Sequence, residues 1–337
     1  MRTTRRHLAL GAVATGLVLV LAGCGDPGSG GGQEEPSASG TSGLPVCDPV
    51  AGETLVVLDD DKGLQNADNI IPAINADVAS AHPEVVMLLD GVSDSLDTDR
   101  LIELNKAVDV DRRTSSEVAA EFVEDEGLAA DDASTGAGTS LTVGAANFSE
   151  SITLAEIYAQ VLRSAGFDAQ AQTIGSRETY LPALQSGAIA VVPEYAATLA
   201  TFLNGQVNGA EADPVASSDV EETVAALTTL AGQSGLVVGT ASDAQDQNAF
   251  AVTAEFAEEN DVQTLSDLAE TCGGIVLAGP PECPERPFCQ IGLEETYGLE
   301  IGDFKSYDFA LIGEAVRQGD ATLGLVTSSD GSLAAGD

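Results

Sequence analysis

Residues 141–203 read LTVGAANFSESITLAEIYAQVLRSAGFDAQAQTIGSRETYLPALQSGAIAVVPEYAATLATFL, and this stretch decides the fold of the chain. An apolar strand, LTVGA, comes first. The next segment has apolar residues at helical spacing, namely Ile152, Ala155, Ile157, Tyr158, Val161 and Leu162. Gly166 follows, where a left-handed residue is expected to end the helix. The remainder reads strand (AQAQTI), turn (GSRE), helix (TYLPALQSG) and strand (AIAVVPEY), and this alternation predicts an α/β fold with parallel strands.

Polar side chains follow each predicted strand: Asn147, Ser149, Arg177, Glu178, Glu194 and Tyr195. Because the carboxyl ends of parallel strands meet at one edge of a sheet, we expect these residues around a ligand crevice. Ser149 also has an ordinary explanation as the N-cap of the helix that follows.

The same stretch resembles the substrate-binding proteins of ABC importers for glycine betaine, choline and other osmoprotectants. The similarity rests on NFSE, GSRETYLPALQSG and PEYAATL, and on PPECPERPFCQIGLEETYG at residues 280–298. It implies a type II, periplasmic-binding-protein-like α/β fold, in which two lobes close about a hinge around a small solute. It further implies delivery of that solute to an ABC permease and its ATPase, without enzyme activity or cofactor.

The order of the chain differs from that family. Residues 54–130 resemble the family's carboxyl-terminal portion, yet here they come first, and SSDG at 328–331 stands where relatives continue into LVVLDDDKG. We expect a circular permutation, with ASTGAGTS (133–140) joining the old termini; a gene-fusion remnant is the alternative. One lobe would then comprise residues 67–248. The other would comprise residues 51–66 and 249–337.

The chain begins MRTTRRHLALGAVATGLVLVLAGC, three arginines and an apolar run that ends at a cysteine. This pattern predicts a lipoprotein signal peptide over residues 1–23 and a lipid on Cys24, which would hold the protein at the extracytoplasmic face of the cell membrane. An uncleaved membrane anchor is the alternative. The Gly/Ser/Pro-rich residues 24–50 are expected to form a flexible tether.

Thirteen basic and 54 acidic residues give a formal net charge of −41. Such a charge repels nucleic acid and anionic lipid, so it argues against both as partners. Solubility explains it without any reference to the ligand. A small solute, transporter subunits and a membrane held through the lipid are the expected partners of a monomer.

Four cysteines remain after Cys24, and an even number suits an exported protein. Four cysteines can be paired in three ways, and we favour the one that joins Cys283 to Cys289 and Cys47 to Cys272. A zinc site is the alternative, but the spacing lacks CxxC pairs and no histidine lies near.

Betaine-type ligands carry a quaternary ammonium, which proteins hold against aromatic faces, while a ligand carboxylate suits an arginine fork. The resemblance implies that Tyr195 binds the ligand and that Arg286 grips a carboxylate from the second lobe, with an exposed surface arginine as the alternative. Arg177 is expected to orient its own loop. Further candidates for ring contacts are Phe148, Tyr180, Phe288 and Tyr307. Core packing is the alternative for the two tyrosines.

Two positions depart from the family pattern. Relatives carry tyrosines where this chain has Asp68 and Thr327, so two walls of an aromatic cage are missing. Asp68 could pair with a cationic ligand or cap a helix or turn. The ligand need not be glycine betaine, and a ligand-independent scaffold or regulatory lipoprotein is the alternative function. Catalysis by a Ser-His-Asp triad would depend on His82, since the other histidine, His7, is in the leader.

Overall fold

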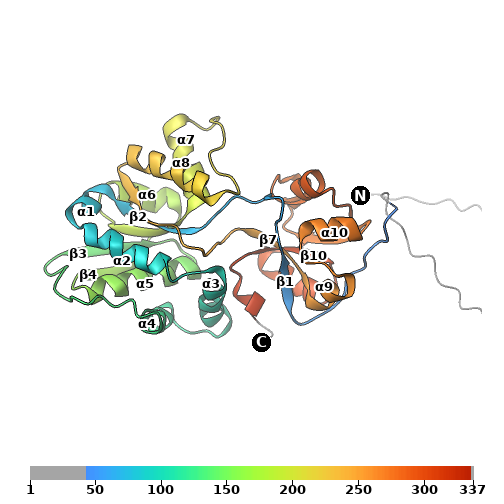
Figure 1. Ribbon diagram of the computed structural model, residues 1–337, viewed down its shortest axis with the longest axis horizontal. Helices are drawn as coiled ribbons and strands as arrows, with labels where there is room; N and C mark the ends of the chain where they lie inside the picture. Colours follow the sequence, from blue (N-terminus) through green and yellow to red (C-terminus); the bar gives the residue numbers. More distant parts are fainter. Residues whose placement is uncertain (1–42, 335–337) are drawn as a thin grey trace, which may run out of the picture. The chain divides into compact units, whose positions relative to one another are not determined.

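The computed structural model describes residues 43–334 (Figure 1). The predicted signal peptide, the predicted lipidation site Cys24 and residues 25–42 of the predicted tether lie outside the described residues. Within the described part of the chain, no helix has both the length and the apolar character needed to cross a membrane.

The first of two sheets has the strand order β4-β3-β5-β2-β6. Its strands are β2 (Ile70–Asn75), β3 (Ser140–Ala145), β4 (Asp168–Thr173), β5 (Val191–Tyr195) and β6 (Leu236–Val238). β3 pairs in parallel with β4 and β5, which confirms the parallel arrangement predicted from residues 141–203. β2 is antiparallel to β5 and β6.

Helices separate the consecutive strands of this part: four lie between β2 and β3, one follows β3, one follows β4, and two lie between β5 and β6. They are α1 (Ala76–Ala81), α2 (Pro83–Ser93), α3 (Thr98–Asn105), α4 (Ser115–Asp125), α5 (Ser149–Ser164), α6 (Arg177–Gln185), α7 (Ala196–Asn208) and α8 (Val220–Gln233). A π-helical turn, η1 (Lys106–Val110), extends α3. α5 buries the apolar face predicted from its sequence, and the turn after it places Gly166 at φ +91°. That φ favours glycine, as expected for a residue that ends a helix.

Two local predictions are wrong. The predicted turn GSRE is shorter, because Ser176 occupies the N-cap position and α6 already begins at Arg177. The N-cap of α5 is Phe148, so Ser149 is the first helical residue instead of the cap. Its hydroxyl donates to Asp109 Oδ2 at 3.0 Å. Ser149 therefore ties α5 to η1.

The second sheet has the strand order β1-β7-β10-β8-β9. Its strands are β1 (Leu55–Leu58), β7 (Asn248–Thr253), β8 (Ile275–Gly279), β9 (Ile301–Ser306) and β10 (Leu323–Thr327). β8 is parallel to β9 and β10, whereas β7 is antiparallel to β1 and β10. The accompanying helices are α9 (Ala254–Asn260), α10 (Leu265–Thr271), α11 (Gln290–Gly292) and α12 (Ile312–Arg317).

The two sheets follow the same plan. Each has three adjacent parallel strands, then one antiparallel strand, then a fifth strand parallel to the first three. The antiparallel strand, β2 in one sheet and β7 in the other, is the strand that the chain enters on arriving from the other sheet. This is the two-lobed α/β architecture that the sequence predicts.

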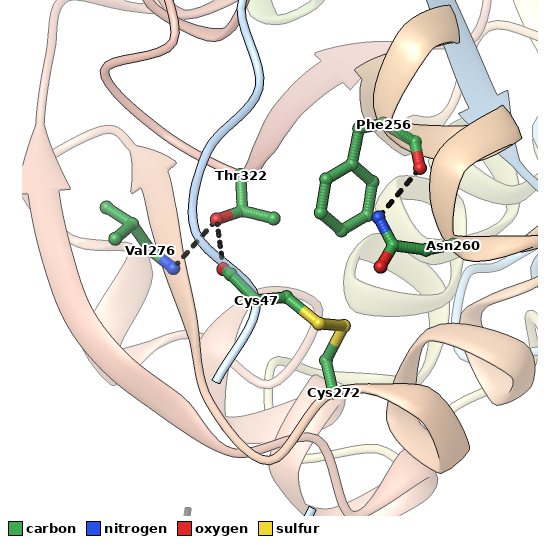
Figure 2. The surroundings of a disulfide bond; sticks show 6 residues. All are labelled: Cys47, Phe256, Asn260, Cys272, Val276 and Thr322. Atoms are coloured by element: carbon green, nitrogen blue, oxygen red, sulfur yellow. Dashed lines mark hydrogen bonds between the residues drawn. A yellow bond between two sulfur atoms is a disulfide. The ribbon is translucent and has the colours of Figure 1, made fainter. Parts of the chain in front are cut away.

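The first described residues pack against the second sheet. The Cys47 amide donates to Gly274 O at 2.9 Å, and the Gly273 amide donates to Pro45 O at 2.7 Å. Thr322 Oγ1 donates to Cys47 O at 3.2 Å and accepts from the Val276 amide (Figure 2). The expected flexible tether is therefore wrong for residues 44–50, because these backbone bonds and a disulfide hold that segment.

Both disulfides that the sequence favours are present. Cys47 is bonded to Cys272 at the end of α10 (Figure 2), and Cys283 is bonded to Cys289 in the loop before α11. All four sulfurs are used, so the zinc alternative for these cysteines is excluded.

Arg317, the last residue of α12, joins a segment near the start of the described chain to a segment near its end. Arg317 Nε donates to Glu53 O at 3.0 Å, and one terminal nitrogen of Arg317 donates to Ser332 O at 2.6 Å. The segment after β10 also reaches the first lobe, where Lys106 Nζ donates to Ala334 O at 2.7 Å.

The two disulfides should differ in their effect on stability. Cys47–Cys272 closes a loop with a sequence separation of 225, whereas Cys283–Cys289 spans a separation of 6. Loop-closure entropy gives a stabilisation of about 5 kcal/mol for the first and about 2 kcal/mol for the second. In urea unfolding, Cys47→Ala with Cys272→Ala should cost more than Cys283→Ala with Cys289→Ala. Equal or reversed costs would contradict this expectation.

Candidate ligand-binding site

Two chain segments connect the sheets and contact each other. Residues 59–69 run from β1 to β2, and residues 239–247 run from β6 to β7. Asn69 and Gln245 form an antiparallel bridge, and the Asp246 amide donates to Asp68 O at 3.1 Å. The side chains near this bridge therefore come from both connections.

A cavity of about 470 Å³ lies at these connections, with walls from both lobes. Its volume is within the range of small-molecule sites. The lining residues are Gln65, Asn66, Asp68, Arg177, Ala197, Thr198, Thr201, Phe202, Asp246, Gln247, Asn248, Phe288 and Thr327. Of the candidate residues named from the sequence, Asp68, Arg177, Phe288 and Thr327 line it.

Asp68 both caps α7 and faces the cavity. Its Oδ1 accepts from the Thr198 amide at 2.9 Å, and its Oδ2 accepts from the Thr198 hydroxyl. Burial raises the pKa of Asp68 to about 6, although these hydrogen bonds and the charge of Arg177 oppose the shift. The structure thus shows the capping role that the sequence offered for Asp68, and pairing with a cationic ligand stays a prediction.

Arg177 is held by a carboxylate in the sheet. Its Nε and one terminal nitrogen donate to Glu194, at 3.0 and 2.7 Å, and Glu194 is 0% exposed. The Tyr180 hydroxyl donates to the same carboxylate at 2.7 Å. Burial disfavours the charged guanidinium, but its hydrogen bond and ion pair with Glu194 outweigh this and raise the pKa of Arg177. Glu194 and Tyr180 are thus positioning residues for a cavity wall.

A polar network connects the first lobe to the loop after β10. Glu150 accepts from the Tyr195 hydroxyl and from the Asn105 amide, both at 2.6 Å. The same Asn105 amide donates to Ser329 O at 2.8 Å, and Ser329 Oγ donates to Asp246 Oδ1 at 2.8 Å. The network joins Tyr195 to the cavity wall through side chains from both lobes.

The two carboxyls of this network have raised pKa values. Burial and the charge of Asp246 raise the pKa of Glu150 to about 7. Burial also raises the pKa of Asp246, while hydrogen bonds from Ser329, Glu150 and Thr327 lower it. Both carboxyls therefore favour their neutral form more than a carboxyl in water does.

Two phenylalanines provide the aromatic surface of the cavity. Phe202 lies on α7, one turn after Thr198, and the Arg177 guanidinium lies 6.0 Å from the centre of its ring. Phe288 comes from the loop closed by Cys283–Cys289 and is 42% exposed. The Gln65 side-chain amide donates to Phe288 O at 3.1 Å.

The remaining predicted contacts lie elsewhere. Tyr195 is buried, with its ring centre 6.2 Å from that of Phe148. Asn147 and Phe148 are exposed on the loop after β3, and Arg286 is exposed on its disulfide-closed loop. Tyr307 packs against the apolar cluster of α12 and contacts Asp320 at 3.5 Å. None of these residues is among those that line the cavity.

Most of the residues that line the cavity are not among those predicted from the sequence. Thr198 and Phe202 are four residues apart after PEY, so helical spacing could have placed them on one face. Asp246, Gln247 and Asn248 follow a short edge strand without any local motif. Only the pairing of the two connections brings them to the site.

Two other cavities help to define the site. One of about 470 Å³ adjoins it and shares Gln65, Gln247 and Asn248. A larger one, of about 740 Å³, lies beside Cys47 and is lined by residues 46–48, 273–276, 294 and 299–303. Among the described residues its lining has no aromatic or basic side chain and has four acidic ones, Asp48, Glu294, Glu300 and Asp303. None of its lining residues comes from the first lobe, so a solute there would not join the two lobes.

Comparisons with known proteins support one family. A model of the family described as "Substrate binding domain of ABC-type glycine betaine transport system" matches residues 50–125 and 139–337. The glycine-betaine-binding protein of Pseudomonas aeruginosa is 36% identical over 86 residues, which are 26% of this chain and 27% of that relative. This chain thus matches about a quarter of the relative's length.

One solved structure is similar over a larger share of the chain. It is described as the crystal structure of a glycine betaine/carnitine/choline ABC transporter. The match covers 58% of this chain and 71% of that chain, with 18% identity and a TM-score of 0.46.

Removing Arg177 should destabilise the fold, because it leaves the buried Glu194 carboxylate without its partner. Arg177→Ala is expected to lower the free energy of unfolding by about 3–5 kcal/mol. The control replaces both partners, Arg177→Met with Glu194→Leu, and should cost less because no buried charge remains. Urea unfolding measures both. A single variant that is no less stable than the double variant would contradict the role of this pair.

The raised pKa of Glu150 should make stability depend on pH. The folded chain binds this proton more tightly than the unfolded chain, so the free energy of unfolding should fall as pH rises from about 4.5 to about 7. Glu150→Gln should reduce that fall by roughly 1–3 kcal/mol. Glu124→Gln, on the exposed side of α4, is the control. Urea unfolding at pH 5 and pH 8 tests this, and an unchanged fall in Glu150→Gln would contradict it.

Proposed function

The chain belongs to the family of substrate-binding domains of ABC-type glycine betaine transport systems, and on this premise we propose that it captures a small solute for import. The cavity between the lobes carries the proposal. Its volume is about 470 Å³, and its walls come from both lobes and include two carboxyl groups and two phenyl rings. A solute that contacts both walls favours closure of the lobes over the open form.

Delivery to a permease completes the proposed role. The family is one of binding domains, so the chain performs no catalysis and the energy for transport comes from an ATPase subunit. We expect the permease to bind the solute-loaded form, in which the lobes are closed. Cys24 would carry the lipid that keeps the protein at the extracytoplasmic face of the membrane, close to the permease.

The chain order is best explained as a circular permutation of this family. Read from residue 139, the chain forms β3 to β6, crosses to β7, and then forms β8 to β10. In that reading β1 would follow β10, and the second crossing would enter β2, which would be the last strand of the permuted order. The family model matches in two segments on either side of residues 126–138, which supports this reading.

A thermal-shift screen tests the proposed function. The purified chain without residues 1–24 is heated with glycine betaine, choline, carnitine, proline betaine, amino acids and polyamines. A solute that binds only the folded state raises Tm by mass action. A scaffold or regulatory lipoprotein would instead show no shift at millimolar solute, together with tight binding of another protein. That result would overturn the proposal.

The two phenyl rings of the cavity wall should contribute to solute binding. Phe202→Ala and Phe288→Ala are each expected to weaken solute binding by about fivefold or more, because each removes a ring from the cavity wall. Phe309→Ala is the matched control, since Phe309 is also 42% exposed but does not line the cavity. Isothermal titration calorimetry measures the affinities. Equal losses in the control and the two variants would contradict this placement of the site.

A further inference from the structure

We propose that the solute in this cavity is a cation whose nitrogen carries hydrogen atoms, an alkylammonium or a guanidinium, instead of a quaternary ammonium. The inference rests on the proposed function and specifies the ligand of the same cavity. Three features of the lining carry it: its charge, its hydrogen-bond acceptors and the small aromatic surface left for a ligand.

The charge of the lining favours a cation. Asp68 and Asp246 contribute two carboxyls from the two connections. Arg177 is the one basic side chain among the described lining residues, and its charge is already paired with Glu194. A ligand carboxylate would therefore meet two acidic groups and an arginine that is already paired. A cation meets two carboxylates at short range.

The hydrogen-bonding groups favour a donor. Within the described chain, Gln247 Oε1 is buried without a hydrogen-bond partner, and Gln247 lines the cavity. Its backbone is fixed, because its amide donates to Ser328 Oγ at 3.0 Å and its carbonyl accepts from the Ser328 amide at 2.8 Å. A buried acceptor without a partner is unfavourable, and a ligand N–H would satisfy it. A trimethylammonium group has no hydrogen atom to donate.

The aromatic surface is small for a quaternary ammonium. Phenylalanine is a weaker partner for a cation than tryptophan, and only two rings line the cavity in the described chain. The Arg177 guanidinium already lies over the Phe202 ring. Phe202 therefore offers a ligand apolar contact but less attraction for a cation, and Phe288 is the ring that is not shared with Arg177. The attraction of one phenyl ring for a methylated nitrogen is weak compared with the hydrogen bonds that this nitrogen cannot form.

The first test is a methylation series on one skeleton. Isothermal titration calorimetry at pH 7.5 compares ethanolamine, N-methylethanolamine, N,N-dimethylethanolamine and choline, which differ in the number of N–H groups. A second arm compares agmatine, which has a guanidinium and an ammonium, with putrescine, in which an ammonium replaces the guanidinium, and so separates these two sources of N–H donors. We expect affinity to fall as methyl groups replace hydrogens, by at least about tenfold from the best N–H cation to choline.

The second test removes the acceptors one at a time. Asp246→Asn, Asp68→Asn and Gln247→Leu should each weaken binding of the best N–H cation by about tenfold and change choline binding less. Gln247→Leu lies outside the Glu150 network, so it remains informative if Asp246→Asn fails to fold. Asp243→Asn, an exposed change of the same charge on the same connection, is the control and should bind as the native chain does.

The outcomes separate this inference from the proposed function. Affinity that rises with methylation, or variants that bind N–H cations as tightly as the native chain, would overturn the inference. Binding of quaternary solutes in those experiments would leave the proposed function standing. A chain that binds no member of either arm overturns the inference, and the broader solute screen then decides the proposed function separately.

Discussion

The contact between the two connecting segments is the constraint on which the site depends. The bridge between Asn69 and Gln245 fixes one connection against the other, and the bond from the Asp246 amide to Asp68 O adds to it. Because each connection leads into the antiparallel strand of a sheet, the bridge also holds the beginnings of β2 and β7 near each other. The Asn69 side chain strengthens this point from within the first lobe, by donating to Ser242 O at 2.8 Å.

Burial of charge at this contact has a cost that the fold offsets with hydrogen bonds. Asp68, Asp246 and Glu150 are carboxyls with raised pKa values, and each is held by neutral donors from other segments. Among the described residues that line the cavity, Arg177 brings the one positive charge, and it forms an ion pair with Glu194. Natural proteins retain such arrangements mainly where a site needs them. A cationic solute would offset the uncompensated negative charge.

The sequence predicted the fold more completely than the site. Helical spacing in residues 149–164 and the strands on either side depend on local patterns, and the structure confirms them. The site depends on contacts between distant segments. Arg177 and Glu194 were placed at strand ends, but the sequence could not show that they pair with each other and leave little of the guanidinium for a ligand. Tyr195 was chosen from a motif, yet its hydroxyl is used by Glu150.

Hydrogen–deuterium exchange with and without a saturating solute from the screen tests the central claim most directly, because it locates binding along the whole chain. The account predicts slower exchange in residues 65–69, 197–202 and 245–248, and in residues 327–329 after β10. Protection confined to residues 46–48 and 273–276, beside the larger cavity, would contradict it. So would binding without any protection of the two connecting segments.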